Sequence, residues 1–378
     1  MIAKWSNALL SIAACPRCRS RVIPCTDADR GRAYRCGNPR CALAEDGFPL
    51  LNEQPVLIDF AASIVDRDGI VTRNGGSVQN RDVDGTWLRT RVHRLLCGHN
   101  HNAGRVAAEL THELKTRPRK PRVLIVGGGT VGTGASPLYT DRDVEAISLD
   151  IYASPNTTLV ADGHRLPLVD ASVDAVWIQA VLEHVLDPPA VVAEIHRVLK
   201  PDGVVFADTP FMQQVHEGIY DFTRFTLHGH RWLFRRFEVI DAGVTRGAAT
   251  GLVWSLRYFI RALTRNARVS TILTLPFFWL RYVDRLLDDG LSADAASGVF
   301  FLGRRSDTSI APKDMVGFYD ELQRLRDGRP HALYRSEPRE SRVQPEPDRR
   351  LRAWSGHQVS GAAGCSSYPA RSGRKRSC

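Results

Sequence analysis

The pattern of apolar and polar residues in the middle of the chain predicts a parallel sheet with intervening helices. Short apolar runs typical of buried strands recur at 123–126, 144–150, 159–162, 175–178 and 204–207, and a turn follows the third of them. A helical pattern occupies residues 189–199, just before the last of these runs. Two further runs, 238–243 and 298–305, bring the expected number of strands to seven. The pattern therefore predicts an α/β domain with a seven-stranded sheet over residues 121–310.

Two further segments carry amphipathic patterns, one before the first strand and one between the last two strands. Residues 87–115 place apolar side chains at helical spacing, after a polar, glycine-rich connector at 66–86. An insertion at about 245–297 alternates aromatic residues and leucines with arginines, which predicts a pair of basic amphipathic helices. Such a pair can lie on an anionic membrane surface. It can equally form a lid or dimer face that buries its aromatic residues.

Length and composition predict several modules rather than one. A chain of 378 residues that is 43% hydrophobic can build more than one compact unit. Its last part is rich in Arg, Ser, Pro and Gly, which predicts disorder. The expected modules are a zinc-ribbon-like segment at 1–60, a connector with a helical segment at 61–120, the α/β domain at 121–310, and a mostly disordered extension at 311–378.

The distribution of charge bears on possible partners. The whole chain has a formal net charge of +10, yet residues 121–240 carry 9 basic and 15 acidic side chains. An acidic central module is poorly suited to gripping a polyanion. A nucleic-acid partner is therefore not expected for it.

The cysteines are concentrated near the N-terminus, with five of the eight in the first 41 residues. CPRC at 15–18 and CGNPRC at 36–41 form the pattern C-x2-C and C-x4-C, two knuckles whose thiolates can converge on Zn²⁺. Free buried cysteines are the alternative, and Cys25 is a fifth candidate. The expected structural zinc ligands are Cys15, Cys18, Cys36 and Cys41.

A glycine-rich loop, VLIVGGGTVGTG at 123–134, follows the first strand of the α/β domain. Its glycines satisfy the spacing G-x-G-x-x-G, which suits close approach of a cofactor to the backbone. No Gly-Lys-Ser/Thr follows, so a P-loop is excluded. Asp150 ends the next strand and can accept both hydroxyls of a ribose, as nicotinamide and S-adenosylmethionine enzymes both require.

Three motifs after this loop separate the two cofactors. They are D-x-H-x-L-P at 162–167, L-E-H-V at 182–185 and H-R-V-L-K-P-D-G at 196–203. Together with the loop they resemble class I S-adenosylmethionine-dependent methyltransferases of the type 11 group, over about residues 121–243. The resemblance implies a Rossmann-like fold and S-adenosylmethionine as cofactor. The residues expected to bind that cofactor are Gly127, Gly129, Gly132, Asp150, Asp162 and Glu183.

One position departs from the family pattern. Ile125 stands two residues before the first glycine of the loop, where the family commonly has an acid that helps to hold the methionine amino group. That amino group must then be held by other residues. The departure also keeps open a scaffold with an impaired cofactor pocket that does not catalyse.

Candidate catalytic residues follow the fourth and fifth strands, where this fold places its acceptor. The stretch at 209–234 mixes histidines and acids with aromatic residues, which suits an acceptor site or lid. Arg224 can hold an anionic group of the acceptor or pair with Asp221. The stretch CGHNHN at 97–102 is interpreted as a loop or helix cap near the cofactor. The candidates for a general base are His216, Asp221 and His184.

These features predict an enzyme that transfers a methyl group from S-adenosylmethionine to a small-molecule, glycan or lipid-linked acceptor. Positioning of the two reactants should supply much of the acceleration. The expected location is the cytoplasm, with peripheral membrane contact through 245–297. An RNA methyltransferase that uses the zinc ribbon for recognition is the alternative.

Overall fold

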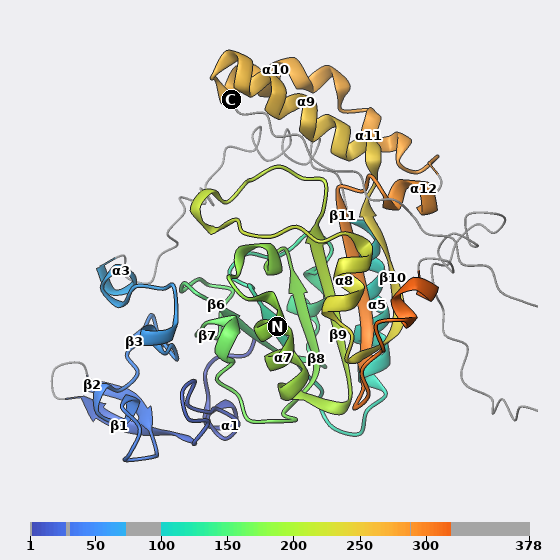
Figure 1. Cartoon of the computed structure of the whole chain (residues 1–378). Coiled ribbons are helices and arrows are strands. Elements are labelled where there is room, and N and C mark those ends of the chain that lie inside the picture. Colours follow the sequence, from blue (N-terminus) through green and yellow to red (C-terminus); the bar gives the residue numbers. More distant parts are fainter. Residues whose placement is uncertain (1, 28–30, 73–99, 288, 319–378) are drawn as a thin grey trace, which may run out of the picture. The chain divides into compact units, whose positions relative to one another are not determined.

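The computed structural model describes residues 2–27, 31–72, 100–287 and 289–318 (Figure 1). A seven-stranded sheet runs in the order β10-β11-β9-β8-β5-β6-β7. Strands β5 to β9 are parallel, and β11 is antiparallel to both of its neighbours. The sheet confirms the expected Rossmann-like class I methyltransferase fold. Its strands are β5 (Arg122–Val126), β6 (Glu145–Asp150), β7 (Leu159–Val160), β8 (Val173–Gln179), β9 (Leu199–Pro210), β10 (Phe237–Arg246) and β11 (Gly298–Arg305).

Helices cover both faces of the sheet because side chains alternate along each strand. In β5, Val123 and Ile125 pack in one apolar cluster with α5 (His101–Lys115). Leu124 and Val126 point the other way and pack in a second cluster with α7 (Pro188–Val198). Figure 1 shows these helices on opposite sides of the sheet. All four strand residues are at most 3% exposed, so β5 is a central, fully buried strand.

Side-chain caps fix where the two covering helices begin. The Asn100 side chain accepts a hydrogen bond from the Ala103 amide at 2.9 Å and starts α5. The Asp187 side chain accepts a hydrogen bond from the Ala190 amide at 3.0 Å and starts α7. The expectation that CGHNHN contains a helix cap is therefore confirmed at Asn100. The part of the expected helix at 87–99, like the expected disorder of the C-terminal extension beyond residue 318, lies outside the described residues.

Two strands differ in extent from the sequence pattern. The third strand was expected to run from 159 to Asp162 but is only Leu159–Val160, and the expected turn after it is present, because Asp162 accepts a hydrogen bond from the His164 amide and turns the chain into η2 (Gly163–Arg165). The fifth strand begins earlier than expected, at Leu199. Its pairing with β8 jumps from Val173↔Leu199 to Ala175↔Val204. The expected Lys-Pro-Asp-Gly turn is thus a bulge within β9.

The N-terminal module consists of short elements that pack on the β7 edge. Strands β1 (Val22–Asp27) and β2 (Gly31–Cys36) pair antiparallel. Further along, the Leu57 amide donates to the Val160 carbonyl at 2.8 Å. The buried Asp59 carboxylate accepts from Arg17 and Arg165. The other elements of this module are α1 (Asn7–Leu10), α2 (Leu43–Asp46), β3 (Leu50–Leu51), β4 (Gln54–Pro55), η1 (Phe60–Ala62) and α3 (Arg67–Thr72).

The segment between β10 and β11 contains the expected helix pair, α9 (Ala248–Thr264) and α10 (Ala267–Thr274), joined at Arg265 in the left-handed conformation. Phe259, Leu263 and Ile272 on these helices are each more than 60% exposed. Of the helices that the structure describes, none is both long and apolar enough to cross a bilayer. The remaining elements are α6 (Ser136–Thr140), η3 (Leu182–His184), η4 (Gly218–Tyr220), α8 (Leu227–Leu233), η5 (Leu275–Phe277), α11 (Leu280–Val283) and α12 (Asp289–Ala293).

A buried carboxylate at the amino end of the sheet provides a test of the fold. Asp174 accepts hydrogen bonds from Arg117 and Lys200, both at 2.8 Å, and from the Arg122 amide at 2.9 Å. Burial opposes ionisation, but these donors outweigh it and lower the pKa of Asp174. We expect Asp174→Ala to lower the free energy of unfolding by about 3 kcal/mol at neutral pH, because three donors lose their partner. Urea denaturation measures this loss.

The loss of unfolding free energy in Asp174→Ala should depend on pH, because it depends on the ionisation of the Asp174 carboxylate. A lowered folded-state pKa stabilises the protein above the unfolded-state value of about 3.9, and this contribution disappears as the pH falls through the folded-state pKa. The difference between wild type and Asp174→Ala should therefore shrink in acid. Asp202→Ala is the control, because Asp202 contacts Arg117 but is 62% exposed and should cost less than about 1 kcal/mol. Equal losses at neutral and acidic pH would contradict this account.

Candidate functional site

Two adjoining cavities lie at the carboxyl ends of the parallel strands. The first, of about 290 Å³, is lined by the glycine loop, by the segment after β8 and by the segment after β9. The second, of about 130 Å³, is lined by the ends of β6 and β7. Gly127, Ala180 and His184 line both, so the two cavities are direct neighbours. Ligands of open α/β sheets bind at this edge.

The glycine loop after β5 packs tightly against its neighbours. Gly127 adopts a φ of +74°, and its amide donates to the Leu149 carbonyl at 2.9 Å. A Cβ at Gly129 would lie 2.4 Å from the ring of Tyr152, and one at Gly132 would lie 2.2 Å from Gln179 Oε1. The positive φ of Gly127 requires glycine there, whereas a Cβ at Gly129 or Gly132 would have to displace the end of the Tyr152 or Gln179 side chain. From the sequence, these glycines were attributed to the close approach of a cofactor to the backbone.

Asp150 closes strand β6 beside this loop. Its Oδ2 accepts from the Gly129 amide and its Oδ1 from the Ile151 amide, both at 2.8 Å. The side chain lines the second cavity and is largely buried. Asp150 thus couples the conformation of the glycine loop to the cavity wall.

Asp162, at the end of β7, lines the same cavity as Asp150. Its Oδ1 contacts the His164 amide at 2.9 Å and His164 Nδ1 at 2.6 Å, and the Ser63 hydroxyl donates to Oδ2. Burial alone would raise the pKa of Asp162, but the hydrogen bonds from His164 and Ser63 outweigh burial and lower it. The carboxylate is therefore ionised. Ser63 belongs to the connector, so this segment also contributes to the cavity.

Glu183, in η3, is fully buried at the wall of the first cavity. Within the described residues, neither of its carboxylate oxygens has a hydrogen-bond partner. Burial raises the pKa of Glu183 to about 8. Glu183 thus lines a different cavity from Asp150 and Asp162.

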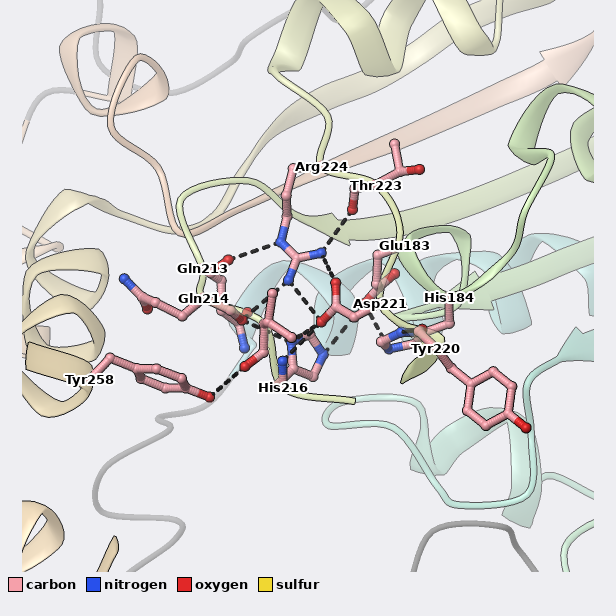
Figure 2. A network of polar contacts seen from close by, with 11 residues as sticks. Glu183, His184, Gln213, Gln214, His216, Tyr220, Asp221, Thr223, Arg224 and Tyr258 are labelled. Atoms are coloured by element: carbon pink, nitrogen blue, oxygen red, sulfur yellow. Dashed lines mark hydrogen bonds and ion pairs between the residues drawn. The ribbon is translucent and has the colours of Figure 1, made fainter. Parts of the chain in front are cut away.

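His184 and His216 lie next to Glu183 (Figure 2). Their Nε2 atoms are 3.6 Å and 3.9 Å from Glu183 Oε1. His184 Nδ1 donates to the Tyr220 carbonyl at 2.7 Å, and burial lowers the pKa of His184. Both imidazoles line the first cavity. The structure thus brings together three of the residues that the sequence had selected.

Asp221 stands behind His216, and Figure 2 shows it engaged by Arg224. Its Oδ2 accepts from the His216 amide at 2.9 Å and from Arg224 Nη2 at 3.0 Å. Burial opposes ionisation, yet Arg224 lowers the pKa of Asp221 to about 2. Of the two roles left open for Arg224, pairing with Asp221 is the one observed. Arg224 also donates to the carbonyl oxygens of Gln213, Gln214 and Thr223.

Sequence reasoning missed a buried acid at the end of β9. Asp208 lines the first cavity and accepts from Asn100 at 2.6 Å, Thr245 at 3.0 Å and Gln179 at 3.3 Å. Burial raises the pKa of Asp208. The sequence feature that could have identified Asp208 is an acidic residue directly after an apolar run, which is the feature that identified Asp150. Ile125, which replaces the acid of the family pattern, is 2% exposed and also lines this cavity.

The four cysteines of the two knuckles form one cluster in the N-terminal module. The Sγ atoms of Cys15 and Cys41 are 3.9 Å apart, and those of Cys18 and Cys36 are 3.3 Å apart. All four sulfur atoms lie within 4.8 Å of one another. These separations resemble the roughly 3.8 Å between sulfur ligands of a tetrahedral Zn²⁺ with bonds of about 2.3 Å. Cys25 is not in the cluster.

Parts of the chain are similar to known methyltransferases. Residues 132–207 match the family model described as a methyltransferase domain. The chain is 39% identical to malonyl-[acyl-carrier protein] O-methyltransferase of Laribacter hongkongensis, with 23% of this chain and 37% of that protein aligned. It is 37% identical to demethylmenaquinone methyltransferase of Renibacterium salmoninarum, over 22% and 38% of the two chains. The chain thus spans less than two fifths of the length of either relative.

Phosphoethanolamine N-methyltransferase 2 of Haemonchus contortus, in complex with S-adenosyl-L-methionine, aligns at a TM-score of 0.36 with 16% identity. The alignment covers 61% of each chain.

Strand order and the position of the cavities define a Rossmann-like protein of the class I methyltransferase fold. Residues 132–207, in the centre of the chain, match a methyltransferase domain. The resemblance to class I methyltransferases of the type 11 group is therefore confirmed.

Proposed function

We propose that the protein transfers a methyl group from S-adenosylmethionine to a small-molecule, glycan or lipid-linked acceptor. The observation that carries the proposal is the placement of Asp150 and Asp162 in the wall of one cavity, directly beside the glycine loop. When bound, the cofactor supplies an electrophilic methyl group for displacement by the acceptor. The protein then has to bind both molecules and align them.

In this proposal the second cavity binds the nucleoside part of the cofactor. Asp150 accepts hydrogen bonds from the ribose hydroxyls, and Asp162 accepts one from the adenine amino group. Ionised carboxylates are strong acceptors for both. Gly127, Gly129 and Gly132 let the loop pass close to the methionine part, where the first cavity begins. Among the cavity-lining residues, the acid best placed to replace the one missing at Ile125 is Asp208.

The acceptor occupies the rest of the first cavity, against His184 and His216. Either imidazole can accept a proton if the acceptor oxygen has to lose one. Asp221 is a weaker candidate for this role, since Arg224 neutralises it and neither cavity is lined by it. We assign Asp221 to holding the His216 backbone in place. Glu183 keeps its expected role toward the cofactor as a prediction.

The N-terminal cluster is proposed to bind one structural Zn²⁺ through Cys15, Cys18, Cys36 and Cys41. Four thiolates close the coordination shell, so this ion has no open position for chemistry. Its role is to fold the module, which Arg17 ties to Asp59 and thereby to the segment that carries Asp162.

Peripheral contact with an anionic membrane is proposed for α9 and α10. The exposed Phe259, Leu263 and Ile272 supply the apolar surface. The arginines between them match the charge of acidic lipids. Tyr258 on α9 donates to the Val215 carbonyl at 2.8 Å, which links this surface to the acceptor side of the site.

Transfer of a labelled methyl group tests the acceptor class. The protein is incubated with methyl-labelled S-adenosylmethionine and separate glycan, lipid and RNA fractions, with the lipids presented in anionic vesicles. We expect label in the glycan or lipid fraction, and none with Asp150→Ala. Label confined to RNA would contradict the proposed acceptor and favour the alternative in which the ribbon recognises RNA.

A further inference from the structure

Three side-chain atoms that all accept hydrogen bonds face one another at the wall of the first cavity (Figure 2). They are Glu183 Oε1, His184 Nε2 at 3.6 Å from it, and His216 Nε2 at 3.9 Å from it. One potential ligand atom from each of the three residues lies within 4.8 Å of the others. We call these residues the Glu183 cluster. Glu183 is fully buried, whereas both histidines reach the cavity.

The other ring nitrogens of the two histidines are already occupied. His184 Nδ1 contacts the Tyr220 carbonyl at 2.7 Å, and His216 Nδ1 contacts the Gln214 carbonyl at 3.2 Å. A carbonyl only accepts, so each Nδ1 carries the proton and each Nε2 of the neutral ring has a free lone pair. Histidines that bind metals are oriented in this way by their second nitrogen.

No donor compensates the carboxylate of this cluster. Both oxygens of Glu183 lack a hydrogen-bond partner within the described part of the chain. The neighbouring cation, Arg224, is committed to Asp221 and to three carbonyl oxygens. A buried carboxylate facing two lone pairs is costly unless it takes up a proton, as the raised pKa of Glu183 allows, or a positive charge lies between them.

We infer that the Glu183 cluster binds a divalent transition-metal ion through Glu183, His184 and His216. Two imidazoles and one carboxylate form a ligand set typical of Zn²⁺ and Fe²⁺. Tetrahedral ligands at about 2.0–2.1 Å from Zn²⁺ are separated by about 3.4 Å. The observed distances of 3.6 Å and 3.9 Å from Glu183 Oε1 exceed this by only a few tenths of an ångström.

The inference deepens the proposed function and rests on it. Three protein ligands leave a coordination position open, and it faces the cavity proposed for the acceptor. A cation there binds an acceptor hydroxyl and lowers its pKa, so that the proton passes to solvent without a histidine as base. The acceptor class that fits is therefore an alcohol, phenol or enol. Glu183 then acts as a metal ligand instead of binding the cofactor.

Metal content per chain tests the inference with the full-length protein. Metal-stripped wild type and variants are dialysed to equilibrium against micromolar Zn²⁺, and bound zinc is measured by elemental analysis. We expect two ions in wild type, one in His216→Ala and one in Glu183→Gln. The control His112→Ala changes an exposed histidine on α5 and should keep two. In Cys18→Ser/Cys36→Ser the ion of the Glu183 cluster should remain.

The outcomes separate this inference from the proposed function. One zinc ion in wild type, unchanged in His216→Ala and Glu183→Gln, would overturn the metal site. S-adenosylmethionine binding is measured by calorimetry on the same samples and should be nearly unchanged in His216→Ala. Absence of cofactor binding in wild type would instead overturn the proposed function, whatever the metal content. Thermal denaturation of each variant establishes that it is folded.

Discussion

Asp150→Ala is expected to weaken S-adenosylmethionine binding at least ~100-fold. In the proposed complex this carboxylate accepts two hydrogen bonds from the ribose, each worth about 1.5–3 kcal/mol when one partner is charged. A loss of about 3 kcal/mol corresponds to more than ~100-fold in Kd. The variant also removes the acceptor for the Gly129 amide, which loosens the glycine loop. Isothermal titration calorimetry of wild type and variant measures the effect.

Two further variants test whether the weaker binding is caused by loss of the Asp150 carboxylate. Asp150→Asn keeps the shape of the side chain but removes its charge, so binding should be weakened less than by Asp150→Ala. Asp143→Ala changes an acid just before β6 that is 75% exposed, and it should bind like wild type. Unchanged affinity in a folded Asp150→Ala protein would remove Asp150 from the cofactor site.

Cys18→Ser/Cys36→Ser is expected to lose the zinc of the N-terminal module and to lower the melting temperature by roughly 10 °C. Structural zinc contributes roughly 10–16 kcal/mol to the folding of small zinc domains. The ribbon shares one apolar core with the sheet, in which Tyr34 and Leu57 pack together with residues of β5 and α7. We assume that about a third of that energy is lost from the global stability, at about 2–4 °C per kcal/mol. Differential scanning calorimetry measures the shift.

Cys25→Ser is the matched control for this variant. Cys25 lies on β1 in the same hairpin but outside the cluster, so this substitution should leave zinc content and melting temperature near the wild-type values. A double variant that still binds zinc in the ribbon, or that melts like wild type, would show that these thiolates do not form a structural site.

Those parts of the fold that depend on local patterns were predictable from the sequence. Apolar runs located all seven strands, and those of the parallel strands β5, β6, β7, β8 and β9 were the clearest because buried parallel strands have no polar face. Cysteine spacing located the cluster because knuckle geometry is local. The bulge at 200–203 and the early end of β7 were not predictable, since they depend on pairing with β8 and on a side-chain cap from Asp162.

The candidate site was predictable residue by residue but not in its arrangement. Motifs selected Glu183, His184 and His216, yet their convergence depends on how the segment after β9 folds back over η3. That fold is held by Arg224, which bridges Asp221 and backbone carbonyls. Asp208 was overlooked because its role depends on Asn100, which lies 108 residues away in the chain.

The most direct test of the central claim is calorimetric titration of the zinc-replete wild-type protein with S-adenosylmethionine, S-adenosylhomocysteine and NADH. We predict micromolar binding of the two sulfur nucleosides and no binding of NADH, because the acidic central module suits a cofactor that carries a sulfonium and an ammonium rather than a pyrophosphate. Absence of binding by both sulfur nucleosides in a folded protein would contradict the account and favour a scaffold whose pocket is impaired at Ile125.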